Sequence, residues 1–178
     1  MKGIAYILLC CILFSCGSKA GLITNEDATT VNPVADPDLV GPIKRATLED
    51  DYNWFDEEYT SYKVDETAAK TIKPYLEDVT VKIFMGTWCH DSQQQVPHFF
   101  KIMDQINFKA VEVYGLTTDK TSPEGLEDQY NIINVPTFIF FKDGEEINRM
   151  VEYPLNTLEK DMVAIFTTDT YENPYAGF

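Results

Sequence analysis

Cysteines, basic residues and long apolar runs are all scarce in this sequence. The chain of 178 residues has four cysteines, and its 14 lysines and arginines stand against 29 aspartates and glutamates, for a formal net charge of −15 at pH 7. Such acidity argues against nucleic acid as a partner and against electrostatic attraction to anionic membranes. The apolar run at residues 4–14 is too short for a membrane-spanning helix, which needs about 20 residues.

This short apolar run is typical of a secretory signal peptide. Met1 and Lys2 precede it, and it ends in Leu13-Phe14-Ser15-Cys16. That tetrapeptide resembles the lipobox of bacterial lipoproteins, whose signal is cut before a cysteine that receives lipid, although Phe14 is bulkier than the usual residue. We predict a lipoprotein signal peptide at residues 1–15 and a lipid on Cys16. The alternatives are an ordinary signal peptide or a soluble protein with an apolar N-terminus.

Lipidation would leave Cys89 as the only free thiol. Cys10 and Cys11 would leave with the signal peptide, so no internal disulfide could form, although an exported chain permits one. Stable anchoring needs more than one acyl chain, which lipoprotein processing supplies. We therefore expect a cell-envelope protein held to a periplasm-facing membrane by its lipid alone.

A tether and an aromatic stretch follow the predicted lipid site. Residues 16–47 are rich in small, polar and proline residues without a sustained period, which predicts a flexible tether. The domain is predicted at residues 48–178 and opens with an acidic, aromatic N-terminal extension. Its rings are expected to dock on the domain, a peptide-binding patch being the alternative; they are Trp54, Phe55, Tyr59 and Tyr62.

The remaining sequence alternates between helical and strand patterns. Apolar spacing predicts a helix at residues 68–76, shortened by Pro74, with Tyr75 on its apolar face. β-branched and aromatic runs predict strands, and Asp143-Gly144 predicts a hairpin turn. Asn156 with Glu159 is typical of a capping box. The further elements are strands at 79–86 and 110–116, helices at 89–106, 122–130 and 156–166, and the hairpin at 136–152. This order predicts an α/β domain with a mixed central sheet and helices on both faces.

Two motifs carry a resemblance to the thioredoxin-like superfamily. In "GTWCHDSQQQVP", Trp88-Cys89 follows a strand and Pro97 lies where thioredoxins have the proline of the active-site helix. In "YNIINVPTFIFFKDGEE", Val135-Pro136 resembles the cis-proline segment. The sequence is also similar to small exported thioredoxin-like lipoproteins of Bacteroidetes-type bacteria. The resemblance spans residues 64–166 and implies a thioredoxin fold with thiol–disulfide exchange at Cys89.

The active-site motif departs from the family at two positions. Ser92 occupies the place of the second cysteine of Cys-x-x-Cys, and Ile83 occupies that of a buried aspartate. The resemblance implies that the second cysteine resolves mixed disulfides and that the aspartate helps its proton transfer. Both losses therefore remove the internal resolving step.

The predicted position of Cys89 at a helix N-terminus still favours a reactive thiolate. At a helix N-terminus, unpaired N–H groups and the helix dipole stabilise a thiolate. Ser92 is expected to donate a hydrogen bond to the Cys89 sulfur. The positive charge of protonated His90 would stabilise the thiolate further, and the negative charge of Asp91 would destabilise it. The alternative is that Cys89 is a relic in a fold kept for binding.

We predict a membrane-anchored monothiol thiol–disulfide oxidoreductase. Cys89 would form mixed disulfides with exported protein substrates against the Val135-Pro136 segment, and a substrate cysteine or a small thiol would release them. The alternative is a non-catalytic module that holds exported proteins. A third idea, iron–sulfur or glutathione binding as in monothiol glutaredoxins, has no specific support in the sequence.

Metal and cofactor binding are not expected. A zinc site needs three or four ligands, and the mature chain offers Cys89, His90 and His98 besides carboxylates. His98 and the glutamines at 93–95 are predicted to lie on the solvated side of their helix. We expect a monomer that requires no cofactor.

Overall fold

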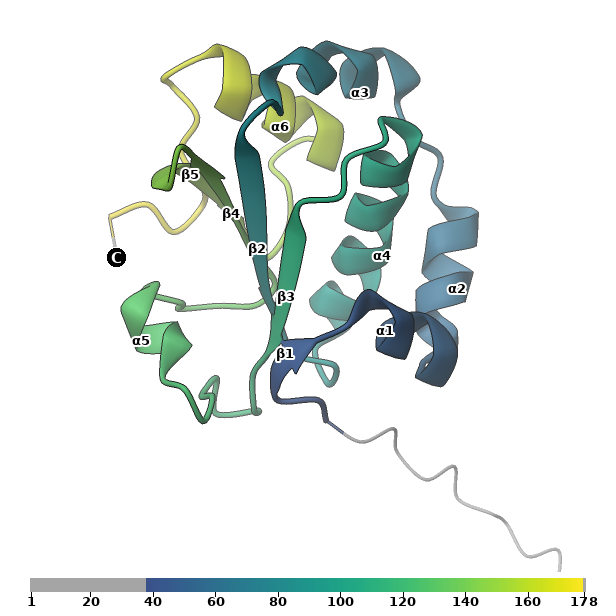
Figure 1. Ribbon diagram of the computed structural model, residues 1–178, viewed down its shortest axis with the longest axis vertical. Helices are drawn as coiled ribbons and strands as arrows, with labels where there is room; N and C mark the ends of the chain where they lie inside the picture. Colours follow the sequence, from purple (N-terminus) through teal and green to yellow (C-terminus); the bar gives the residue numbers. More distant parts are fainter. Residues whose placement is uncertain (1–37, 178) are drawn as a thin grey trace, which may run out of the picture. The chain divides into compact units, whose positions relative to one another are not determined.

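The computed structural model describes residues 38–177, so the predicted signal peptide, Cys16 and the tether up to residue 37 lie outside the described residues. A five-stranded sheet forms the centre, in the order β1-β3-β2-β4-β5 (Figure 1). Strands β2 and β3 pair in parallel, and the other neighbours pair antiparallel. The predicted mixed sheet is confirmed. The strands are β1 (Gly41–Ile43), β2 (Val79–Met85), β3 (Val111–Gly115), β4 (Thr137–Lys142) and β5 (Glu145–Val151).

Helices cover the two faces of the sheet unequally. Alternate residues of β2 face opposite ways, so that Ile83 lies in a large core and Phe84 in a smaller one. Figure 1 shows α4 and α5 on opposite sides of the sheet. The large core is built with residues of α1 (Arg45–Asp51), α2 (Asn53–Ser61), α3 (Glu66–Ile72), α4 (His90–Gln105) and α6 (Leu158–Thr167). On the other face lies α5 (Leu126–Gln129), a helix of four residues.

Local sequence signals predicted several of these elements correctly. The strands at 79–86 and 110–116 correspond to β2 and β3, and the hairpin joins β4 to β5. Its turn residues Asp143 and Gly144 have φ of 53° and 85°, as a type I′ turn requires. Pro74 lies in a 3-10 turn, η1 (Lys73–Tyr75), which ends α3 early as expected.

Three local predictions were wrong. Tyr75 is 43% exposed because the 3-10 turn rotates it off the apolar face of α3. Helix α5 begins at Leu126 rather than at residue 122, since the Ser122 hydroxyl instead caps the Leu126 N–H. The capping box at residue 156 does not form, because Thr157 is the N-cap of α6. The carboxylate of Glu159 is buried and accepts hydrogen bonds from Tyr62 and the Asp65 backbone instead.

The folded domain begins before the predicted boundary at residue 48. Gly41–Ile43, assigned to the tether, forms β1 and pairs antiparallel with β3. Without it, the backbone N–H and C=O groups on one side of β3 would be unpaired. Gly115 on β3 permits this approach, because a Cβ there would lie 2.1 Å from the Leu39 carbonyl oxygen. Strand β1 and helix α1 are therefore part of the domain.

The aromatic N-terminal extension docks on the large core, as predicted. Phe55 is 2% exposed, and Trp54, Tyr59 and Tyr62 pack against the same cluster. Arg45 adds an ion pair across the junction, with two guanidinium nitrogens 2.9 and 2.6 Å from the Asp104 carboxylate oxygens on α4.

The prediction that His98 lies on the surface was wrong. Its ring stacks on Tyr62 with centroids 4.1 Å apart, and Nε2 lies 2.9 Å from the Glu58 carboxylate. Burial lowers the pKa of His98, and the bond to Glu58 opposes that shift. His98 therefore helps to hold α2 against α4.

Candidate active site

A tight turn presents the tryptophan and the cysteine of the motif. After β2, the Cys89 N–H donates to the Gly86 carbonyl at 3.0 Å. The Trp88 indole folds back over Gly86, where a Cβ would lie 2.4 Å from the ring, and its Nε1 donates to the Leu116 carbonyl at 2.9 Å. Only a glycine at position 86 allows this packing. The turn thus fixes Trp88 beside the thiol.

Cys89 lies where two separate segments of the chain meet. It is the N-cap of α4 and is half-buried. Its Sγ donates to the Val135 carbonyl at 3.3 Å, and the Val135-Pro136 bond is cis. The predicted cis bond before Pro136 is confirmed, and the group of this segment that contacts Cys89 is the carbonyl of Val135. A sulfur atom at a helix N-terminus beside a backbone carbonyl is open to exchange chemistry with a bound disulfide.

Ser92 lies in the first turn of α4 but does not donate the predicted hydrogen bond to the Cys89 sulfur. Its side chain is fully buried, and its Oγ accepts from the Gly86 N–H at 3.2 Å. Ser92 therefore fixes the turn before α4. Ile83 is also fully buried, in the large core. Ser92 and Ile83 therefore place a hydroxyl group and an aliphatic group at the two positions where the resemblance to thioredoxins implies a second cysteine and an aspartate.

Two polar residues that sequence reasoning missed also hold the active-site turn. Gln93 was expected on a solvated face, but its Nε2 donates to the Thr87 carbonyl at 2.7 Å. Thr87 is buried, and its hydroxyl accepts from the Leu39 N–H at 3.1 Å. Gln95, also expected on the solvated face, is buried as well. The position of Gln93 in the first turns of α4 was the signal that it could reach back to the loop.

A second set of missed residues supports the segment before Pro136. The Lys120 Nζ donates to the Ile133 carbonyl at 2.8 Å and to the Asn134 side-chain oxygen at 2.6 Å. Thr137 donates to the Asn134 carbonyl at 2.6 Å. These bonds position the Val135 carbonyl opposite Cys89. No short-range sequence signal indicates them, because Lys120 comes from the loop after β3.

The other predicted site residues lie at the N-terminal end of α4. His90 is exposed and Asp91 is half-buried, both in the first turn of α4.

Within residues 38–177 no group of three or more His, Cys, Asp or Glu side chains could hold a metal ion. No helix in that same range is long and apolar enough to cross a membrane.

Comparison with known proteins identifies the family. The thioredoxin family model matches residues 60–164. The chain belongs to the thioredoxin family. Three relatives are "Thioredoxin Y, chloroplastic" of Oryza sativa subsp. japonica (33% identical over 85 residues; 48% of this chain, 46% of the relative), "Thioredoxin Asp f 29" of Aspergillus fumigatus (28% over 88 residues; 48% and 78%), and a thioredoxin-like protein of Synechocystis (31% over 85 residues; 48% and 73%).

The matches to these relatives cover about half of this chain and only part of each relative. The chain spans about half the length of the rice thioredoxin that it matches. Among solved structures, Fasciola hepatica thioredoxin gives a TM-score of 0.35 at 25% identity, over 46% of this chain and 75% of that chain. The strand order and the cis peptide bond before Pro136 agree with the predicted thioredoxin fold.

Proposed function

We propose that this thioredoxin-family protein is a membrane-anchored monothiol thiol–disulfide oxidoreductase of the cell envelope. The observation that carries the proposal is the juxtaposition of Cys89 with the carbonyl of Val135, 3.3 Å away. A substrate disulfide bound along the Val135-Pro136 segment would place its sulfur beside the only cysteine among the described residues. Membership of the thioredoxin family supports the same chemistry.

The proposed reaction is a pair of thiol–disulfide exchanges. The Cys89 thiolate attacks one sulfur of a substrate disulfide, a Cys89–substrate disulfide forms, and the other substrate sulfur leaves as a thiolate with the electron pair. A second cysteine of the substrate, or a small external thiol, then attacks the mixed disulfide and returns Cys89 to the thiolate. When the cysteine that releases Cys89 belongs to the substrate, one substrate disulfide is replaced by another, and no net oxidation or reduction occurs. The proposed activity is therefore isomerisation or thiol exchange.

Capture of covalent partners tests this proposal. Cells that express the wild-type chain, quenched with acid and analysed without reductant, are expected to show higher-mass adducts that dithiothreitol removes. Cys89→Ser is the control, because its hydroxyl is a far poorer nucleophile than a thiol at neutral pH. Adducts of equal abundance in both proteins would refute the exchange chemistry. Their complete absence from the wild type would favour a binding module that uses the same surface without covalent chemistry.

Membrane attachment is proposed to rest on a lipid at Cys16. Because the chain has a strong negative charge, the anchor must come from acyl chains rather than from attraction to anionic lipids. Cys16→Ala is expected to move the protein from the membrane to the soluble fraction, or to leave an unprocessed precursor. Metabolic labelling with a fatty acid measures the modification. Equal labelling of Cys16→Ala and wild type would rule out Cys16 as the lipid site.

A further inference from the structure

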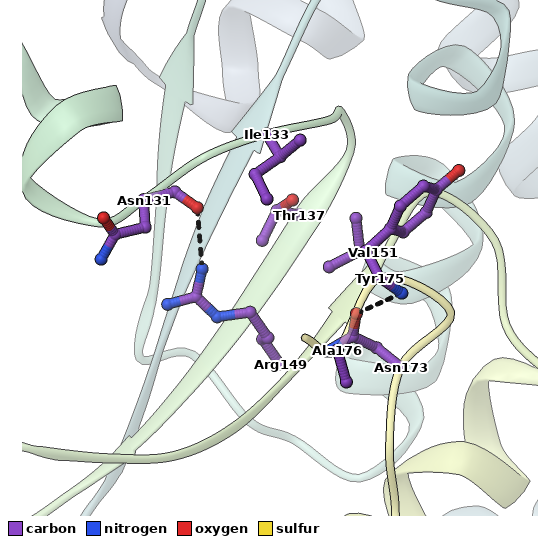
Figure 2. Close-up of a pocket in the computed structure, with 8 residues that line it drawn as sticks. All are labelled: Asn131, Ile133, Thr137, Arg149, Val151, Asn173, Tyr175 and Ala176. Carbon is purple, nitrogen blue, oxygen red and sulfur yellow. Dashed lines mark hydrogen bonds between the residues drawn. The ribbon is translucent and has the colours of Figure 1, made fainter. Parts of the chain in front are cut away.

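A pocket lies beside the segment that faces Cys89. Its volume is about 320 Å³, at the lower end of the range for ligand pockets and sufficient for one large side chain. Figure 2 shows side chains from three separate parts of the chain around it. They are the loop before the cis-proline (Asn131, Ile133), the strands β4 and β5 (Thr137, Arg149, Val151) and the C-terminal segment (Asn173, Tyr175, Ala176).

The C-terminal segment is held in place over this pocket. The Asn148 side chain on β5 donates to the Tyr171 carbonyl at 3.1 Å, and the Tyr171 hydroxyl bonds Asp161. Further on, the Tyr175 hydroxyl donates to the Glu152 carboxylate. The Glu152 N–H donates in turn to the Pro136 carbonyl at 2.7 Å. One wall of the pocket is therefore tied to the cis-proline segment itself.

The lining of the pocket favours an uncharged side chain. Arg149 contributes the one cationic group, but its Nε and Nη2 bond the Glu146 carboxylate and its Nη1 bonds the carbonyls of Tyr130 and Asn131. The hydrogen bond to Glu152 raises the pKa of Tyr175 to about 12, so its phenol is neutral at physiological pH. A charged guest would meet no free partner of opposite sign among the lining residues.

The loop that lines the pocket leads along the chain into the segment that contacts Cys89. Ile133 is 46% exposed and lies two residues before Val135, whose carbonyl faces the thiol. Side chains of an extended peptide alternate between faces and advance about 3.3 Å per residue. A peptide lying along this segment, with its cysteine at Cys89, would therefore place the residue two positions away beside Ile133.

We infer that this pocket is a specificity subsite for a large aromatic side chain two residues from the substrate cysteine. The inference rests on the proposed exchange chemistry at Cys89. Ile133, Val151 and the Tyr175 ring would contact the aromatic ring, and the amides of Asn131 and Asn173 could meet a polar group at its tip. Tyr175 is thus assigned a role in substrate selection that lies outside the active-site turn.

Peptides with an activated cysteine test the subsite. Each peptide carries its cysteine as a 2-pyridyl disulfide, so that attack by Cys89 forms the mixed disulfide and releases pyridine-2-thione. The series places Tyr, Phe, Ala, Asp or Lys two residues before or after the cysteine, since either strand direction could bring the side chain to Ile133. The full chain in detergent is then equilibrated with glutathione, and mass spectrometry measures the ratio of peptide-bound to glutathione-bound Cys89.

An aromatic residue at one of the two positions is expected to favour the peptide adduct about tenfold over alanine, as burial of a large side chain predicts. Tyr175→Ala and Ile133→Ala should each abolish most of that preference. Tyr75→Ala is the matched control, because Tyr75 is an exposed tyrosine outside the pocket lining, and it should keep the full preference. Circular dichroism establishes that the variants are folded.

The outcomes separate the subsite from the exchange chemistry. If all peptides form the adduct equally well, or if the preference survives in both Tyr175→Ala and Ile133→Ala, the subsite is refuted while the proposed function stands. If no peptide reacts at Cys89, the proposed function fails and the subsite fails with it. A preference that Tyr75→Ala also removes would mean that the discrimination does not come from the pocket.

Discussion

Ser92→Cys is expected to shorten the lifetime of Cys89 mixed disulfides by at least tenfold and to raise turnover on a generic disulfide. A thiol at position 92 would lie one helical turn after Cys89 and attack the mixed disulfide from within the same molecule. Such intramolecular attack has a high effective concentration. The serine hydroxyl of the wild type cannot do this at neutral pH. Ser92 is fully buried, and cysteine has nearly the same shape, so the substitution should fit.

The measurement follows the decay of a preformed Cys89 adduct after free substrate thiol is removed. Ser92→Ala is the matched control, because it removes the hydroxyl without adding a thiol and should leave the adduct as long-lived as in the wild type. Turnover is followed as reduction of a chromogenic disulfide in excess dithiothreitol. An adduct of Ser92→Cys that persists as long as that of the wild type would show that position 92 is out of reach of the Cys89 sulfur.

Ile83 sets a limit on the gain from Ser92→Cys. It is buried in the large core, at the position where the resemblance to thioredoxins implies an aspartate. An isoleucine cannot take the proton from a new thiol at position 92. Adding Ile83→Asp to Ser92→Cys should raise turnover further, provided that the double variant folds. Burying a carboxyl group without a partner is costly, so the stability of the double variant must be measured beside its activity.

Phe55→Ala is expected to lower the free energy of unfolding by about 3–5 kcal/mol, the usual cost of removing a buried phenylalanine ring. Phe55 is 2% exposed, and its ring lies 6.0 Å from that of Phe100 on α4 and 6.2 Å from that of Tyr59. The loss would leave a cavity between the N-terminal extension and α4. Pulse proteolysis of the full chain in a urea series measures the change.

The control for Phe55→Ala is Tyr75→Ala, which removes an exposed ring and should change the free energy by no more than about 0.5 kcal/mol. A loss below about 1 kcal/mol for Phe55→Ala would contradict the close packing of the extension. It would instead favour the alternative that these rings form a surface patch for peptides.

Local signals accounted for most of the scaffold and for the centre of the site. Apolar residues at helical spacing define the buried side of α4, and β-branched runs define β2 and β4, because each pattern depends only on neighbours along the chain. The motif around Cys89 and the Val135-Pro136 pair predicted which two segments meet at the thiol. Their meeting was an inference from resemblance, and the structure confirms it.

Polar side chains were the main source of error. Glu159 fits a capping box, and His98 fits a solvated helix face, yet both are buried. Their partners, Tyr62 and Glu58, lie 97 and 40 residues away in the sequence. A polar residue is buried wherever a distant partner satisfies its hydrogen bonds, and no local pattern names that partner.

The sequence by itself determined the order of the core elements, the cis-proline segment and the position of Cys89 at the start of α4. Only the tertiary structure decided that β1 pairs with β3, that Ser92 binds Gly86 rather than the sulfur, and that the C-terminal segment forms one wall of a pocket beside Pro136. The physical reason is that periodicity records which face of an element avoids water. It does not record which distant segment will cover that face, and this depends on the packing of the whole domain.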